Sequence, residues 1–509
     1  MTDTERKGLD VSCSELEILN PLRDVDVEDR DEETSIKKVD MDDKQSFLTE
    51  LRHNTDTQFK VILSICVALA NSMLGWIKGQ IGPAFLDILY ISNTDLERGS
   101  AFMTSYYTGR AVGSILGGSL YSRMNRYLIL VVSMSINGVT LALIPWCAQY
   151  ELMVTAHVIQ GLCNGVMNVV LTAVAVSIWG ASVRGRVYLN MYMAAICPTG
   201  LLAPMATFPF LSPSSNDVAS PIATQNSSDN IVNTTNSFIT EGNISKHNAI
   251  LQSHIAQTEM PASNVYIAFS ISAGLALLST LPFVVIYFKT SKHDNKGRAS
   301  EESNFIGNLS LSIKRLQLVN IGVFAMFYMS LNFTFSGYLT AFCVQQLRWT
   351  KTSGALLTSV LFLTMLFGRI VGAYLSHFFK PMKMLVLSSL LHAVALFGFA
   401  ASGVVLSDTG IWISVCIIGT VLSLIWPSLL SWTNENLISV RGKMSAFLLL
   451  IGFVGALSSP LLFGYMMEEV SPIWFCFLNL GKAGVLIINV ILMFVYLRLL
   501  RKSRTTAEQ

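Results

Sequence analysis

Polar side chains recur every fourth residue within an apolar segment in the first third of the chain. They are Gln160, Asn164, Asn168 and Thr172, and this spacing places them on one helical face. A polar face on an apolar span is costly against lipid, so it must face protein or water. Because amides can bind the hydroxyls of a solute, we predict that Gln160, Asn164 and Asn168 contact a substrate. The alternative is that these amides join neighbouring helices.

A second polar stripe with the same spacing occurs further along the chain. It consists of Tyr328, Asn332 and Ser336. A sugar needs hydrogen bonds for its hydroxyls and apolar cover for its C–H faces, and amides beside aromatic rings supply both. We predict that Tyr328 and Asn332 contact substrate, together with Trp426 from a later apolar segment. The alternative for Trp426 is packing in the core or at the membrane interface.

Three of the basic residues within apolar segments are candidates for a binding or structural role. Lys78 shares a helical face with Asn71 and is predicted to contact substrate, with snorkelling to lipid headgroups as the alternative. Arg110 and Arg369 stand at equivalent places in the pentapeptides GRAVG and GRIVG. This equivalence predicts a shared structural or gating role against neighbouring helices. Recognition of an anion is the alternative for both arginines.

The composition indicates an integral membrane protein. Hydrophobic residues make up 52% of the 509 residues and charged residues only 13%, about half the usual share of charge. These values exclude a disordered chain, a nucleic-acid-binding protein and an ordinary cytosolic enzyme. The sequence shows no phosphate-binding loop, catalytic constellation or metal-ligand spacing, and its eight cysteines are scattered. We therefore expect no enzyme activity, no cofactor and no structural metal.

Twelve apolar runs are long enough to cross a bilayer, for which roughly 20 residues are needed. They lie near residues 60–88, 99–121, 127–147, 151–178, 187–209, 264–288, 316–345, 352–377, 383–405, 409–433, 443–466 and 473–498. The GRAVG and GRIVG pentapeptides are 259 residues apart, and the similar segments 182–186 and 439–443 are 257 residues apart. Two nearly equal offsets indicate a duplicated unit of six spans. The predicted fold is an all-α membrane protein with two parallel six-helix repeats.

The polar segments between and around the spans define the predicted domains. The tail, residues 1–58, is acidic, since residues 1–60 contain 17 acidic and 9 basic side chains. The other predicted parts are an N-terminal bundle (59–288), a linker (289–315), a C-terminal bundle (316–498) and a C-terminal tail (499–509). The sequence identifies no protein partner for the N-terminal tail.

Lys and Arg gather in alternate loops, which predicts that both termini are cytoplasmic. The loop 211–263 then falls on the opposite side, and it carries three N-x-S/T sequons at Asn226, Asn233 and Asn243. Since glycans are attached on that side, we expect these three asparagines to be glycosylated. The expected location is the plasma membrane.

The loop after the second span resembles the signature G-x-L-x-D-R-x-G-R of the major facilitator superfamily. Residues 118–126 read GSLYSRMNR, so Ser122 replaces the Asp and Asn125 replaces the second Gly. In that family the loop links helices that slide during transport. The resemblance therefore implies a structural or gating role for Arg123 and Arg126.

Several short motifs, in order, resemble the sodium-dependent glucose transporter branch of that superfamily, which is related to fucose permease. They include GPAFLD at 82–87, GSILGG at 113–118, IPWC at 144–147, IWG at 178–180 and LAP at 202–204, within a resemblance that spans about 60 to 500. The family pattern carries acidic residues where this chain has Asn168 and Asn332. Hard cations prefer charged oxygen ligands, so sugar recognition could persist here while ion coupling is lost.

These observations predict a secondary transporter of a small polar solute, with a hexose such as glucose favoured. It would work by alternating access, with sodium as a candidate coupling ion, and its partners would be the solute and the lipid bilayer. The first alternative is a transporter of small organic anions that uses Lys78, Arg110 or Arg369 as counter-charges. The second is a receptor or scaffold without transport, acting through the acidic tail and the glycosylated loop.

Overall fold

The computed structural model describes residues 52, 54–179, 188, 191–212, 263–290, 310–376, 378–438 and 442–508. The chain divides into two compact units, residues 1–65 and residues 66–509. The described part of the first unit is essentially the first turns of α2 (Thr55–Ile91). All contacts reported below lie within the second unit. The three predicted glycosylation sites, Asn226, Asn233 and Asn243, lie outside the described residues.

The described residues form twelve helices of twelve residues or more, and each coincides with one predicted apolar span. After α2 come α3 (Leu96–Arg123), α4 (Arg126–Leu143), α5 (Tyr150–Trp179), α7 (Ile196–Thr207) and α9 (Val265–Thr290). The remaining six are α10 (Leu311–Gln345), α11 (Lys351–Leu375), α12 (Pro381–Val405), α13 (Asp408–Asn436), α14 (Gly442–Tyr465) and α15 (Trp474–Glu508). Short helical turns extend α4, α7 and α14 at Ile144–Trp146, Phe208–Phe210 and Met466–Val470. The prediction of an all-α fold is confirmed.

Eleven of these described helices are long and apolar enough to cross a membrane, and α3 is the exception. The 28 residues of α3 correspond to about 42 Å of helix, which is enough to span a bilayer. Its low apolarity comes from Ser, Thr, Gly and Arg residues, and it packs against α5 and α14. The polar residues of α3 are therefore mostly covered by protein, so length and packing support the twelfth span.

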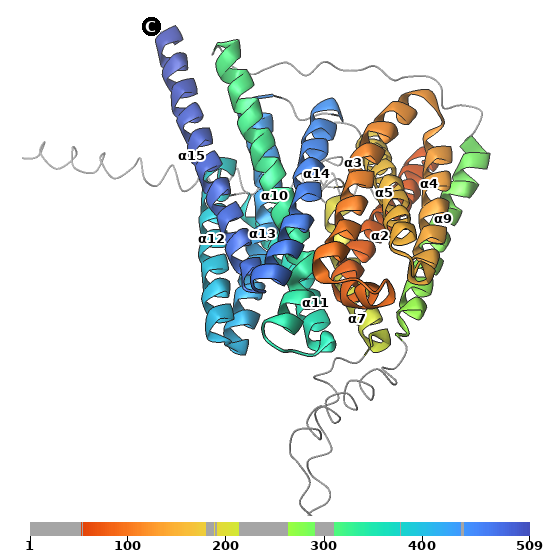
Figure 1. Cartoon of the computed structure of the whole chain (residues 1–509). Coiled ribbons are helices and arrows are strands. Elements are labelled where there is room, and N and C mark those ends of the chain that lie inside the picture. The colour runs from red at the N-terminus through yellow and green to blue at the C-terminus, as the bar shows by residue number, and fades with distance from the viewer. Residues whose placement is uncertain are drawn as a thin grey trace, which may run out of the picture. The chain divides into compact units, whose positions relative to one another are not determined.

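The helices form two groups of six within residues 66–509. In the first group α5 packs against α3 and α4, and α4 packs against α9. In the second, α13 packs against α11 and α12, while α10 packs against α14 and α15. The groups meet where α3 contacts α14 and α7 contacts α11. Figure 1 shows the second group, coloured green to blue, beside the first, coloured orange to light green.

The two similar pentapeptides pack in the same way in the two groups. A Cβ atom on Gly109 of α3 would lie 2.2 Å from the carbonyl oxygen of Val158 on α5. A Cβ on Gly368 of α11 would lie 2.2 Å from the carbonyl oxygen of Thr420 on α13. In both groups glycine thus allows the second span to approach the fourth closely. The sequence repeat is therefore a structural repeat.

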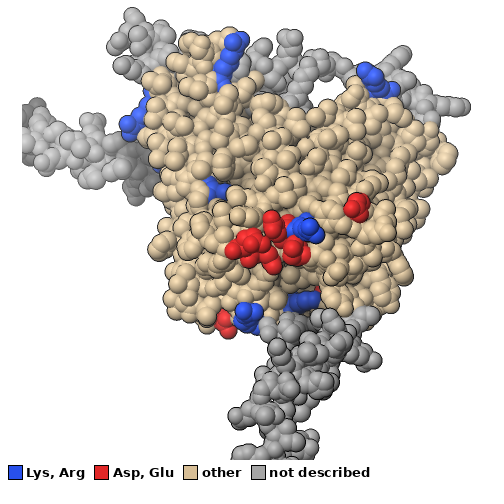
Figure 2. Space-filling view, viewed as in Figure 1, with Lys and Arg blue, Asp and Glu red and all other residues tan. Residues whose placement is uncertain are grey.

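Uncharged residues cover most of the described surface on the face shown in Figure 2. Large hydrophobic side chains are exposed on several helices, among them Ile115, Phe288, Val394 and Ile491. In water such exposure would be unfavourable over a large area, whereas lipid covers it without penalty. The protein is therefore a multi-pass membrane protein, as its composition predicts.

The two predicted boundaries of the C-terminal bundle differ from the helix ends. The linker was expected to reach residue 315, but α10 begins at Leu311. The C-terminal tail was expected from residue 499, but α15 continues to Glu508. In both places a helix runs past the apolar segment into basic residues. Helix ends are set by backbone hydrogen bonding rather than by hydropathy, so apolar runs underestimate helix length.

Candidate functional site

A hydrogen bond joins the two groups of helices at the middle of α2. The ammonium group of Lys78 donates to Oδ1 of Asn332 on α10. The two helices approach closely nearby, because a Cβ atom on Gly82 would lie 2.5 Å from the carbonyl oxygen of Ser336. Lys78 and Asn332, 254 residues apart in sequence, are thus the centre of the candidate site.

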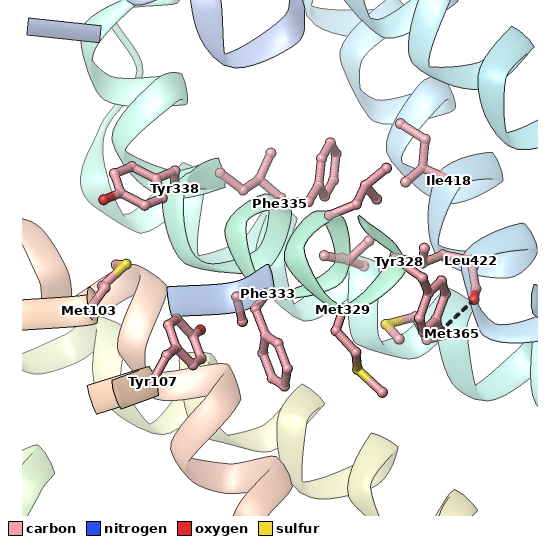
Figure 3. Packing of buried hydrophobic residues seen from close by; sticks show 14 of the residues in the cluster. Met103, Tyr107, Tyr328, Met329, Phe333, Phe335, Tyr338, Met365, Ile418 and Leu422 are labelled. Atoms are coloured by element: carbon pink, nitrogen blue, oxygen red, sulfur yellow. Dashed lines mark hydrogen bonds between the residues drawn. The ribbon is translucent and has the colours of Figure 1, made fainter. Parts of the chain in front are cut away.

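The hydrogen bonding continues from Asn332 into the second group. Nδ2 of Asn332 donates to the Tyr328 hydroxyl at 3.3 Å, and that hydroxyl donates to the carbonyl oxygen of Leu422 on α13 at 3.1 Å. Figure 3 shows Tyr328 and Leu422 with this second bond as a dashed line. The ring of Trp426 stacks on Tyr328, with centroids 5.5 Å apart and planes inclined by 16°. The structure therefore brings four predicted residues together: Lys78, Asn332, Tyr328 and Trp426.

Aromatic rings cover the basic side chains at this interface. The Lys78 ammonium lies 5.0 Å from the ring centre of Phe333 on α10 and 5.4 Å from that of Phe362 on α11. The Arg110 guanidinium lies 5.3 Å from the Phe333 ring and 4.5 Å from that of Phe453 on α14. Such contacts stabilise a cation through the negative face of the ring. Two cations of the first group thus share one ring of the second.

A narrow cleft, with no free space for a water molecule, lies between α2, α3 and α10 around these cations. Tyr107 lines it, and its ring centroid is 5.0 Å from that of Phe333; Figure 3 shows the two side by side. The residues lining the cleft are Lys78, Ile81, Tyr106, Tyr107, Arg110, Phe333, Ser336 and Gly337. The lining combines positive charge, hydroxyl groups and flat apolar rings. This combination suits a small solute with polar edges and an apolar face.

Arg369 lies on α11, near enough to Lys78 for their charges to repel each other. It is half-buried, and its Nε atom has no hydrogen-bond partner among the described residues. The repeat equivalence of Arg110 and Arg369 predicts a shared structural role. Arg110 is placed against rings of the other helix group, whereas Arg369 lies on α11 within its own group. Their roles as gating residues stay predictions.

The polar stripe of α5 has hydrogen-bond partners of its own, although the cavity that Gln160 lines shares Ile81, Tyr106 and Tyr107 with the cleft around Lys78. Nδ2 of Asn164 donates to Oδ1 of Asn137 on α4 at 3.2 Å and to the Gln160 carbonyl at 2.9 Å. The Gln160 side chain lines a small cavity of ≈ 20 Å³ inside the first group, beside Gln80 and His157, about the space of one water molecule. Asn164 therefore has the helix-to-helix contact of the alternative interpretation.

Asn168 is half-buried one turn further along α5. The backbone carbonyl oxygen of Asn168 accepts a 2.7 Å hydrogen bond from Oγ1 of Thr172. The same Oγ1 atom lies 3.3 Å from the Tyr192 hydroxyl. The structure thus connects this end of the stripe to the segment that leads into α7. It does not bring Gln160, Asn164 or Asn168 into the cluster around Lys78.

Comparison with known proteins agrees with the fold of two helix groups. The family model described as Major Facilitator Superfamily matches residues 260–460. Human sodium-dependent glucose transporter 1 is 25% identical over 408 residues, covering 78% of this chain and 72% of that protein. The crystal structure of a D-xylose–proton symporter superposes with a TM-score of 0.60 at 14% identity, covering 86% of this chain and 97% of the other. The transporter FucP in its outward conformation gives a TM-score of 0.51 at 16% identity, covering 83% and 97%.

The chain has the major facilitator fold. Its sequence resembles the sodium-dependent glucose transporters, so the predicted resemblance is confirmed. In a fold built of two parallel repeats, substrate sites lie near the midplane between the repeats. The Lys78–Asn332 contact lies between the two helix groups.

The signature loop of the major facilitator fold connects α3 to α4. Asn125 caps α4, since its Oδ1 accepts a 2.9 Å hydrogen bond from the Tyr127 amide. Arg126 donates to Oγ of Ser177 on α5 at 3.2 Å, and Arg123 is exposed. The asparagine that replaces the family glycine is thus a helix cap. The gating role implied for Arg123 and Arg126 stays a prediction.

An ion pair between the two helix groups was not predicted. Asp87, near the end of α2, is fully buried and lies 2.5 Å from the ammonium group of Lys351 at the start of α11. Its carboxylate also accepts hydrogen bonds from the Ser212 amide at 2.8 Å, the Ser212 hydroxyl at 2.9 Å and the Ser263 hydroxyl at 2.5 Å. A carboxylate inside an apolar span was the available signal, but the sequence does not show which cation it meets.

Lys482 of α15 is a second residue that was not predicted. Its ammonium is buried, donates to Oγ1 of Thr334 at 3.0 Å and lies 4.2 Å from the ring centre of Phe463. These partners belong to α10 and α14, so Lys482 is enclosed within the second helix group. In the sequence, Lys482 is recognisable as a single lysine within the last apolar span. Within the described residues, no group of three or more His, Cys, Asp or Glu side chains is placed to hold a metal ion.

Proposed function

We propose that this protein is a secondary transporter that carries a small polyhydroxylated solute between its two helix groups by alternating access. One observation supports the proposal above the others. The hydrogen-bonded series from Lys78 through Asn332 to Tyr328 connects α2 of one group with α10 and α13 of the other. A solute that entered this interface would exchange these bonds for its own, and rocking of the groups would expose it to each side in turn.

The chemistry of the cluster favours a sugar-like solute. Asn332 offers an amide, Tyr328 and Tyr107 offer hydroxyls, and the faces of Trp426 and Phe333 can cover C–H groups. Four of these five residues come from α10 and α13, and Lys78 faces them from α2. The similarity to a human protein named as a glucose transporter supports a solute whose carbon skeleton is that of a hexose such as glucose.

We further propose that transport does not require sodium. Hard cations prefer charged oxygen ligands, so a carboxylate would be the natural ligand for a coupling sodium ion. The buried carboxylate among the described residues is Asp87, which is engaged by Lys351 and two serines. The resemblance implies acidic residues at the positions of Asn168 and Asn332, which are amides in this chain, and of these two Asn332 lies at the candidate site. Amides can bind hydroxyl groups without binding a cation.

The membrane orientation is also part of this proposal. Both termini would be cytoplasmic, the loop 211–263 would be extracellular and glycosylated, and the protein would lie in the plasma membrane. The support comes from the alternating Lys and Arg content of the loops and from the three sequons.

The test is uptake of labelled sugars into cells that express the full chain, in sodium medium and in choline medium. The panel contains neutral hexoses and their acidic derivatives, and surface biotinylation confirms expression. Equal uptake in both media, above mock-transfected cells, is the expected result. Uptake that needs sodium would overturn the coupling proposal. If no member of the panel entered despite confirmed surface expression, the transport proposal would be wrong.

A further inference from the structure

Two cations at the candidate site have no acidic partner. Arg110 is 7% exposed, and its Nε atom has no hydrogen-bond partner among the described residues. Its surroundings are the rings of Phe333 and Phe453 and the Tyr106 side chain. Lys78 is half-buried, with Asn332 as its hydrogen-bond acceptor. Rings and an amide reduce the penalty of a buried charge but do not neutralise it.

The described carboxylates cannot supply the missing charge. Asp87 lies nine residues beyond Lys78 on α2, about 14 Å along the helix, and it already pairs with Lys351. In the part of the chain that the structure describes, every other Asp and Glu side chain is at least partly exposed. The interface therefore holds the positive charges of Lys78 and Arg110, which repel each other, and Arg369 of α11 adds a third positive charge near Lys78.

A neutral hexose would leave this charge uncompensated when it bound. An anionic solute would pair with both cations and, in a site shielded from water, would gain more from each pairing than it would in water. The Arg110 guanidinium can donate two hydrogen bonds to one carboxylate or phosphate group, and the Lys78 ammonium can donate another hydrogen bond to the same group. Both groups lie beside the ring of Phe333, at 5.0 and 5.3 Å from its centre, and both line the same cleft, where one anionic group would meet both.

We propose that the transported solute is a sugar derivative that carries an oxyanion, either a carboxylate or a phosphate, bound between Lys78 and Arg110. This inference rests on the proposed transport function. Its hydroxyl groups would bind Asn332, Tyr107 and Tyr328, and its carbon frame would lie against Phe333. The amide-rich site thus recognises the polyhydroxylated frame, while the two cations select the charged member of the class.

The first experiment compares uptake of four solutes with the same number of carbon atoms: glucose, gluconate, glucuronate and glucose 6-phosphate. Cells express the full chain or one of three variants, with surface amounts matched by biotinylation. We expect at least one of the anions to enter faster than glucose. Uptake of a carboxylate but not of the phosphate, or the reverse, identifies which oxyanion the site takes.

The variants test the charge of Lys78. Lys78→Gln should lower anion uptake at least tenfold, and Lys78→Arg, which keeps the charge, should retain a large part of it. Lys482→Gln is the matched control, because it removes a buried lysine charge that lies against an aromatic ring within the second helix group. Anion uptake that is the same in Lys78→Gln as in the original chain would overturn the proposal.

Thermal unfolding of the purified full chain in detergent separates binding from transport. We expect an anion, but not glucose, to raise the melting temperature, and Lys78→Gln to abolish that increase. Glucose uptake without anion uptake or anion binding would overturn this inference and leave the transport function standing. Anion binding that depends on Lys78, without uptake of any solute, would support the site and overturn the transport function. Absence of both binding and uptake would overturn both.

Discussion

Two polar stripes with the same spacing have different surroundings in this protein. On α5 the stripe begins with Gln160 and Asn164, whose contacts lie inside the first helix group. On α10 the stripe of Tyr328 and Asn332 meets Lys78 from the other group and Leu422 of α13. Equal periodicity therefore did not produce equal surroundings. A polar stripe shows that a helix face is covered by protein or water, but it does not show which neighbour covers it.

The buried charges show a similar contrast. Asp87 and Lys351 neutralise each other where the ends of α2 and α11 meet. Lys78 and Arg110, in the middle of α2 and α3, have rings and an amide instead of a carboxylate. The paired site is suited to holding two helix ends together. The unpaired site is suited to receiving a charge from outside the chain.

The largest expected effect comes from the close packing of α5. A Cβ atom at Gly165 would lie 2.2 Å from the carbonyl oxygen of Arg110, which belongs to backbone and cannot rotate away. Gly165→Val should therefore destabilise the fold by about 4 kcal/mol or more and remove the monodisperse peak in size-exclusion chromatography. Gly118→Val is the control, because nothing lies within 4 Å of a Cβ there. A normal peak for Gly165→Val would show that α5 is not packed as described.

The next effect concerns the ion pair between the helix groups. Asp87→Asn leaves the mostly buried Lys351 without a counter-charge, which should cost about 3 kcal/mol of stability. Lys351→Met combined with Asp87→Asn should be less destabilised than the sum of the single variants, because no unpaired charge remains. Thermal unfolding of the four proteins measures this coupling. Additive losses would mean that the two side chains do not interact.

A charge placed in the α10 stripe should act on transport rather than on folding. Asn332→Asp would put a carboxylate beside the Lys78 ammonium and neutralise it internally. Anion uptake should fall about tenfold, a change of about 1.4 kcal/mol, while surface expression remains. Asn168→Asp makes the same substitution on the α5 stripe and should have a smaller effect on uptake. An equal loss in both variants would contradict the contrast between the stripes.

The smallest effect is expected from the hydrogen bond between α4 and α5. Asn164→Ala, Asn137→Ala and the double variant form a cycle that isolates this contact, whose length is 3.2 Å. Hydrogen bonds between membrane helices average about 0.6 kcal/mol in such cycles. We expect a coupling of that size in thermal unfolding, with the KM for uptake unchanged. A raised KM with unchanged stability would show that Asn164 contacts the substrate.

Part of the candidate site was predictable from single helices. Lys78, Asn332, Tyr328 and Trp426 were each recognisable as polar or aromatic side chains within apolar spans. The Asp87–Lys351 pair was not, because its members are 264 residues apart and each has several possible neighbours. Asn164 was predicted to contact substrate, and its contact with Asn137 instead favours the packing alternative.

The sequence by itself determined the twelve helices, the internal repeat and the faces that avoid lipid. It does so because a bilayer requires apolar segments of a set length and forbids unsatisfied backbone groups, so hydropathy and periodicity decide local structure. Only the tertiary structure decided that α10, rather than α5, presents its amide to Lys78. That outcome depends on the rotation and crossing of helices against one another, which close contacts such as Gly82 against Ser336 set and no single helix encodes.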